Sequence, residues 1–193
     1  MNTRENKLFK LKYHEQKMTL VRKYKPQKFS DIVGQEKAIS ELKQFLNDFY
    51  NKKSKTKKAI AFHGPAGTGK TTLAEVCAKE LNAELFELNS SDLRNKKKLR
   101  ETLKPVMEQT SLIKEKKIVL VDEAGGITGT DRGGVKELER IMDDAKHPII
   151  ITANDIWKRK LSPIRKKAKL VEVKPLDYNT VKSVLISILK KEG

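Results

Sequence analysis

The chain has 193 residues and a formal net charge of +17, because 42 lysines and arginines face 25 aspartates and glutamates. It has no run of about 18 apolar residues and no apolar stretch in its charged start, which argues against a transmembrane helix, a membrane partner and a signal peptide; one cysteine, Cys77, rules out a disulfide framework. We therefore expect a basic cytoplasmic protein whose charge favours nucleic acid, although a thermophile's charged surface is an alternative explanation.

The apolar pattern predicts a loose extension (1–17), an extended, turn-rich stretch (20–32), a helix (35–50) and a basic loop (51–58). Short apolar runs then alternate with helical spacings, predicting strands at 59–62, 85–88, 117–121, 148–153 and 170–173 and helices at 71–81, 93–109, 135–145 and 179–191. A glycine-rich loop (125–134) interrupts them. This alternation predicts an α/β fold in which helices flank a parallel sheet.

One motif joins the first predicted strand to the next predicted helix. Residues 64–71, Gly-Pro-Ala-Gly-Thr-Gly-Lys-Thr, match the P-loop pattern G-x-x-x-x-G-K-[ST]. Its glycines let successive backbone N–H groups surround a phosphate chain, with the positive end of a helix behind them. Lys70 would reach the β and γ phosphates, and the hydroxyl of Thr71 would bind Mg²⁺. The nucleotide-binding residues expected here are Gly64, Pro65, Ala66, Gly67, Thr68, Gly69, Lys70, Thr71 and Thr72; a plain glycine turn is the alternative.

Polar residues follow two later strands. Asp122 and Glu123 end the run Ile118–Val121, which would place Asp122 beside the metal and Glu123 where it can polarise a water molecule. Asn154 ends the strand at 148–153 and could hold the attacking water, because the carboxyl ends of parallel strands share one edge. The alternative for Asn154 is a turn-forming residue before Asp155.

With these motifs the sequence resembles the AAA+ ATPases, and within them the clamp-loader branch. Residues 20–26 (Leu-Val-Arg-Lys-Tyr-Lys-Pro) and 29–35 (Phe-Ser-Asp-Ile-Val-Gly-Gln) look like that family's adenine-binding lead segment. Residues 128–134 (Thr-Gly-Thr-Asp-Arg-Gly-Gly) resemble the loop after the acidic pair in large subunits of archaeal-type replication factor C. The resemblance covers roughly residues 18–193.

The resemblance implies an AAA+ domain over 18–174 and the beginning of an incomplete helical lid over 175–193. The chain would then be a fragment, half of a split subunit or a degenerate copy. Tyr24, Pro26, Ile32 and Val33 would line the adenine pocket, Asn89 would control Glu123, and Asn154 would be the first sensor. The apolar face Val135, Leu138, Ile141 and Met142 would belong to the helix that leans on the sliding clamp, unless it is ordinary core. The chain departs from the family at Gly125, where an acidic residue is common, and in lacking a lead-segment tryptophan.

By the same resemblance, the chain would be an ATPase that uses ATP and Mg²⁺, and that acts with replication factor C small subunits to load the sliding clamp (PCNA) onto primer-template DNA. The alternatives are another AAA+ DNA machine, a non-hydrolysing ATP-binding module or a simple P-loop kinase. The family's Ser-Arg-Cys finger motif falls on Lys166-Lys167-Ala168, so the chain would receive an arginine finger and give none.

Two basic clusters are candidate phosphate contacts, with a solvated surface as the alternative for each. They are Arg94, Lys96, Lys97, Lys98, Arg100 and Lys104, and Lys158, Arg159, Lys160, Arg165, Lys166 and Lys167.

Overall fold

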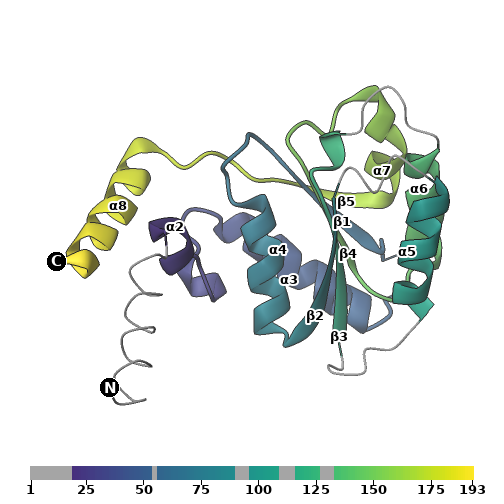
Figure 1. The fold of residues 1–193 in the computed structure, drawn as a ribbon, viewed down its shortest axis with the longest axis horizontal. Coiled ribbons are helices and arrows are strands. Elements are labelled where there is room, and N and C mark those ends of the chain that lie inside the picture. The colour runs from purple at the N-terminus through teal and green to yellow at the C-terminus, as the bar shows by residue number, and fades with distance from the viewer. Residues whose placement is uncertain (1–18, 54–55, 90–95, 109–115, 127–132) are drawn as a thin grey trace, which may run out of the picture.

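The computed structural model describes residues 19–53, 56–89, 96–108, 116–126 and 133–193. Its centre is an all-parallel sheet with the strand order β2-β3-β4-β1-β5 (Figure 1). The strands are β1 (Ala59–His63), β2 (Ala83–Asn89), β3 (Lys116–Asp122), β4 (Ile149–Ala153) and β5 (Ala168–Glu172). The predicted parallel α/β fold is confirmed, and each of the five predicted strands has its counterpart in this sheet.

Helices cover both faces of the sheet, which explains why the three central strands, β3, β4 and β1, carry largely apolar runs rather than an alternating pattern. Ile60 and Phe62 of β1 pack with α3 (Glu36–Tyr50) and α4 (Lys70–Glu80), whereas Ala59 and Ala61 face the other side. That side is covered by α5 (Lys96–Glu108), α6 (Gly134–Asp144) and α7 (Ser162–Lys167) (Figure 1). The sheet is therefore the middle layer of three, between two layers of helices.

Two regions differ from the prediction. The stretch at 20–32, expected to be extended, contains the short helix α2 (Leu20–Lys23) and the 3₁₀ turn η1 (Phe29–Asp31). α2 closes with the Tyr24 N–H donating to the carbonyl of Leu20. It stops there because the residue before Pro26 is disfavoured in helical conformation.

The second cationic cluster, for which no element was predicted, forms η4 (Arg159–Leu161) and α7. Pro163 lies in the first turn of α7, where a proline costs no helical hydrogen bond.

The last helix, α8 (Tyr178–Glu192), stands beside α2 and away from the sheet (Figure 1). A buried glutamine fixes the segment that leads to it: Gln35 Nε2 donates to the carbonyl of Lys174 at 2.7 Å. At the other end of α8, Lys23 forms an ion pair with Glu192 at 2.8 Å. These contacts hold α8 against the lead segment, while the division at residues 174 and 175 stays a prediction.

α8 leaves large apolar side chains exposed, namely Val181, Leu185, Ile186 and Leu189. Among the described residues, no helix combines the length and the apolar character that crossing a membrane needs. The predicted extension (1–17), both ends of the predicted helix 93–109 and most of the loop 128–134 lie outside the described residues.

Candidate nucleotide-binding site

The P-loop residues 64–69 connect β1 to α4, and Lys70, Thr71 and Thr72 begin that helix. Three of its glycines have positive φ angles: Gly64 at 148°, Gly67 at 78° and Gly69 at 89°. At Gly64 a Cβ atom would also lie only 2.1 Å from the carbonyl oxygen of Val173. Glycine is therefore required at position 64 for two reasons. Its φ angle is positive, and a side chain would collide with the backbone of Val173, which directly follows β5.

Lys70 is folded into the loop that it follows. Its ammonium donates to the carbonyl oxygens of Gly64 at 2.9 Å and Pro65 at 2.7 Å, and the residue is only 7% exposed. Burial lowers the pKa of Lys70, and the nearby carboxylates of Asp122 and Glu123 oppose that shift. A cation held in this way by neutral carbonyls can exchange them for an anionic phosphate oxygen.

The P-loop meets β3 through a hydroxyl and a carboxylate. Thr71 Oγ1 donates to Asp122 Oδ1 at 2.9 Å, which brings together the two residues predicted to bind the metal. The same oxygen of Asp122 accepts a second hydrogen bond, from Thr152 Oγ1 of β4, at 2.6 Å. Asp122 therefore lies at the mouth of the P-loop, with its carboxylate held by hydrogen bonds from α4 and from β4.

Glu123, directly after β3, has an unusual backbone conformation. Its φ angle is 52°, in the left-handed region that non-glycine residues rarely adopt. Its backbone N–H donates to Thr152 Oγ1 at 2.9 Å, while its side chain is exposed to solvent. Strained backbone of this kind persists where the surroundings hold it in place and is frequent at functional sites. This φ angle is found where β3 ends, since Glu123 directly follows Asp122, the last residue of that strand.

Two predicted polar residues lie at the same edge. Asn89, the last residue of β2, is in register with Asp122. Asn154 follows β4 directly and is exposed. The ends of β2, β3 and β4 thus bring Asn89, Glu123 and Asn154 to one edge beside the P-loop, and the roles of these residues stay predictions.

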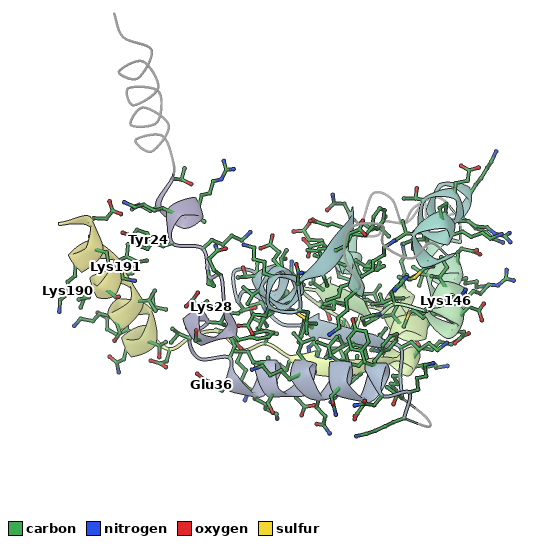
Figure 2. The ribbon with its side chains drawn as sticks, turned by 90° about the horizontal axis from the view of Figure 1, so that it is seen from below. Tyr24, Lys28, Glu36, Lys146, Lys190 and Lys191 are labelled. Atoms are coloured by element: carbon green, nitrogen blue, oxygen red, sulfur yellow. The ribbon has the colours of Figure 1, made fainter. Side chains whose placement is uncertain are left out.

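The predicted adenine-pocket residues are divided by the structure. Tyr24, Pro26 and Val33 line one cavity, together with residues of α8 (Ser183, Val184, Ser187 and Ile188). Ile32 is half-buried and packs against the apolar cluster of α3 and α4 instead. Tyr24 lies beside α8, with the ammonium of Lys191 5.8 Å from its ring centroid (Figure 2). The lead segment and α8 therefore form this cavity jointly.

Thr152 is the site residue that the sequence did not reveal. It is one polar residue inside the apolar run of β4 and is 2% exposed. Sequence patterns assign such a residue to the core. Its hydroxyl becomes important only because β4 is the neighbour of β3 in the sheet, where Val121 is in register with Ile151, the residue before it.

The apolar face expected on α6 is mostly core. Val135, Leu138 and Met142 are buried against β3 and β4, and Ile141 is half-buried on the same cluster. The alternative of ordinary core packing thus accounts for most of this face.

The first basic cluster surrounds a buried carboxylate of α6. Lys96, Arg100 and Arg140 approach the Glu137 side chain at 4.0, 3.9 and 3.8 Å. Arg94 lies outside the described residues, and so does the side chain of Lys98. These cations are partly balanced within the chain, which organises them on the surface between α5 and α6.

Lys167, the residue at the finger position, also forms ion pairs within its own chain. Its ammonium donates to Asp143 Oδ2 of α6 and lies 3.6 Å from Glu139 Oε1. The hydrogen bond to Asp143 raises the pKa of Lys167. This side chain is held on α6 rather than extended from the surface.

The residues at the carboxyl edge suit a nucleotide with its magnesium ion. Among the described residues, no group of three or more histidine, cysteine or carboxylate side chains is placed to hold a metal alone. Thr71 and Asp122 supply two oxygen ligands of the kind that Mg²⁺ prefers, which leaves phosphate oxygens and water to complete the set. The glycine cradle and the buried Lys70 suit the phosphates.

The three-layer fold, the P-loop between β1 and α4 and the adjoining acidic strand end define a P-loop nucleotide-binding protein of the α/β class. Residues 60–173 match the model of the "ATPase family associated with various cellular activities (AAA)". The match covers more than half of the chain, and the chain belongs to this family.

Three curated relatives are named "Replication factor C large subunit". The chain is 38% identical to that of Methanococcus aeolicus over 177 residues, which is 91% of this chain and 37% of the relative. It is 37% identical to that of Thermofilum pendens over 173 residues (89% and 42%) and 38% identical to that of Pyrococcus abyssi over 173 residues (90% and 35%). The chain thus spans less than half the length of these relatives. The predicted resemblance to the archaeal large subunits is confirmed.

Proposed function

We propose that this chain is the nucleotide-binding part of a clamp-loader large subunit, which binds ATP with Mg²⁺ and uses its hydrolysis to help load a sliding clamp onto primer-template DNA during replication. The observation that carries the proposal is the hydrogen bond from Thr71 to Asp122. It joins the P-loop to the acidic strand end in a chain whose relatives are named replication factor C large subunit.

In this proposal each residue has a defined task. Lys70 exchanges the carbonyl oxygens of Gly64 and Pro65 for phosphate oxygens. The attraction between its ammonium and the phosphate is stronger there than in water, because burial excludes water. Thr71 and Asp122 hold the magnesium ion, which neutralises phosphate charge when bound. Their hydrogen bond already sets both oxygens at the mouth of the loop.

Glu123 and Asn154 act on the water molecule at the carboxyl edge. The backbone of Glu123 is fixed by Thr152, so its exposed carboxylate is presented from a rigid point. A carboxylate there can orient a water molecule and accept its proton, and Asn154 can hold the same water by its amide. Asn89 is in register with Asp122, which supports a role in limiting where the Glu123 side chain lies.

The relatives' name and the chain's charge support the proposed partners. Replication factor C small subunits would complete the complex, the sliding clamp (PCNA) would be its cargo, and primer-template DNA would meet the basic surfaces. Lys167 is bound to Asp143 and Glu139, which supports a subunit that gives no finger to a neighbour. A finger received from a small subunit is worth about 10³- to 10⁵-fold in related phosphoryl transfers, so the chain alone should hydrolyse ATP very slowly.

The test compares Lys70→Ala with Lys53→Ala, a lysine whose side chain is largely exposed and pairs with Asp48. Wild type and both variants are assembled with small subunits, clamp and primer-template DNA. We expect Lys70→Ala to lower ATP-dependent clamp loading by at least about 100-fold and Lys53→Ala to leave it unchanged. Equal loading by wild type and Lys70→Ala would remove the site assignment.

A further inference from the structure

The loop that follows β4 presents the chain's single tryptophan to solvent. Trp157 is 66% exposed and lies between Asn154 and η4, on the carboxyl edge of the sheet. A scattered exposed apolar residue needs no explanation by itself. Here the ring is also held firmly in position, which is unusual for a side chain that packs so little of its surface.

Four contacts hold Trp157 and the residues on either side of it. The guanidinium of Arg165 lies over the indole ring, 5.5 Å from its centroid. Its Nη1 atom donates to the carbonyl of Ile156 at 2.8 Å and to that of Lys158 at 3.0 Å, the two residues that flank Trp157. The backbone N–H of Trp157 donates to Asp155 Oδ1 at 2.8 Å. One arginine from α7 therefore holds both the loop and the ring.

The ring is covered on one face and one side. Arg165 occupies one face, and His63 meets the indole in a T-shaped contact, with centroids 6.2 Å apart and planes at 74°. Two thirds of the residue nonetheless stay open to solvent. A flat aromatic surface backed by a cation is prepared to stack with another π system without further loss of side-chain entropy.

The segment that carries Trp157 is strongly cationic. Residues 155–167 contain six lysines and arginines and one acidic residue. The exposed cations are Lys158, Arg159, Lys160 and Lys166, and three of these, Arg159, Lys160 and Lys166, line a cavity between this segment and α6. The cores of protein–protein interfaces are depleted in charged residues, whereas single-strand nucleic-acid sites combine aromatic platforms with cationic grooves. The charge therefore favours a nucleic acid over a protein partner.

We propose that Trp157 is a stacking platform for an unpaired base of DNA, with the cations around it contacting the adjacent phosphates. The inference deepens the proposed function, because it assigns to this loop the single-stranded part of a primer-template junction. The platform adjoins the nucleotide site: Lys158 donates to the carbonyl of Gly125, two residues after Glu123, at 3.1 Å.

The test uses the tryptophan's own fluorescence, which reports this one position in the chain. Oligodeoxythymidylate, blunt duplex DNA and a primer-template junction are titrated against wild type, Trp157→Ala, Trp157→Phe and Tyr178→Ala. Tyr178 is a matched control, because it is an aromatic residue 76% exposed at the start of α8. End-labelled DNA gives the affinities of the variants that lack tryptophan.

We expect oligodeoxythymidylate and the junction to quench Trp157 emission, and Trp157→Ala to weaken their binding by about 5-fold to 150-fold. Trp157→Phe should recover part of the loss, and Tyr178→Ala should bind as wild type does. Because the indole is uncharged, Trp157→Ala should keep the salt dependence, whereas Lys160→Ala should lower the slope of log K against log salt by about 0.7.

Several results would overturn the stacking platform. They are unchanged DNA affinity in Trp157→Ala, quenching by blunt duplex alone, no DNA binding by wild type, or quenching by small subunits without DNA, which would make the loop a subunit interface. Each of these leaves the Lys70→Ala comparison standing, so the platform can fail while the ATP-dependent function holds.

Discussion

Thr152 offers the sharpest test of how the site is built, through Thr152→Val and Thr152→Ser. Its hydroxyl donates to Asp122 at 2.6 Å and accepts the backbone N–H of Glu123 at 2.9 Å. Valine keeps the volume of threonine and removes both hydrogen bonds. Serine keeps the hydroxyl and removes only a methyl group. The pair therefore separates the hydrogen bonds from the packing at a residue that is almost fully buried.

The magnitude follows from what each change leaves behind. A hydrogen bond to a charged group is worth about 1.5–3 kcal/mol and one between neutral groups about 1 kcal/mol. Thr152→Val should therefore cost roughly 2–4 kcal/mol, which lowers Tm by about 5–15 °C in a chain of this size. Thr152→Ser should cost about 1 kcal/mol for the lost methyl group. The valine variant should thus be the less stable one, although it is the better match in volume.

Two assays follow. Thermal unfolding by circular dichroism gives Tm, and calorimetric ATP titrations with Mg²⁺ and with EDTA give the contribution of the metal. We expect the valine variant to lose most of the Mg²⁺-dependent gain in ATP affinity, because Asp122 is no longer fixed from β4. The serine variant should keep it. If Thr152→Val melted within about 1 °C of wild type and kept its Mg²⁺ dependence, the role given to this hydroxyl would be wrong.

Gly64→Ala should lower Tm by at least about 4 °C, because its Cβ would lie 2.1 Å from the carbonyl of Val173; Gly67→Ala, whose Cβ meets no atom within 4 Å, is the control, and an equal loss in both would contradict the close approach. Burial raises the pKa of Cys77 to about 12, so at pH 8 a thiol reagent should label the native chain at least about 100-fold more slowly than the urea-unfolded chain. Since the unfolded thiol titrates near pH 8.5, the free energy of unfolding should fall as pH rises from about 8.5 towards about 12, and rapid native labelling would contradict the burial. Lys167→Ala should leave ATP hydrolysis by neighbouring small subunits unchanged in an assembled complex, because its ammonium is held by its own chain; silenced hydrolysis would assign it a finger's role.

Much of the fold could be predicted because its signals are local. The strand at 59–62 is apolar throughout and the strand at 117–121 is apolar from Ile118 onward, as is typical of strands buried on both faces, and their predicted ends lie within one residue of those observed. The P-loop was recognisable because its chemistry fixes residue types over eight consecutive positions. Signals of this kind depend little on which strand lies next to which.

The features that were not predicted depend on neighbours distant in sequence. Thr152 is a core residue until β4 is placed beside β3, and Gly64 has a second constraint only because Val173 passes close to it. The place of Ile32 in the lead segment predicts a residue of the adenine pocket, and the structure packs its apolar side chain against the cluster of α3 and α4. The fold decides such cases, because burial depends on three-dimensional neighbours.

β4 connects the two proposed activities of this chain. Its residue Thr152 fixes Asp122 and the backbone of Glu123, and five residues further on the same segment carries Trp157. Lys158 returns from that loop to the carbonyl of Gly125, so the loop is tied to the strand end that holds Glu123. A base stacked on Trp157 would therefore contact a segment that is hydrogen-bonded to the acidic pair through Thr152 and to Gly125 through Lys158. These hydrogen bonds form a contiguous path between the loop of Trp157 and the acidic pair.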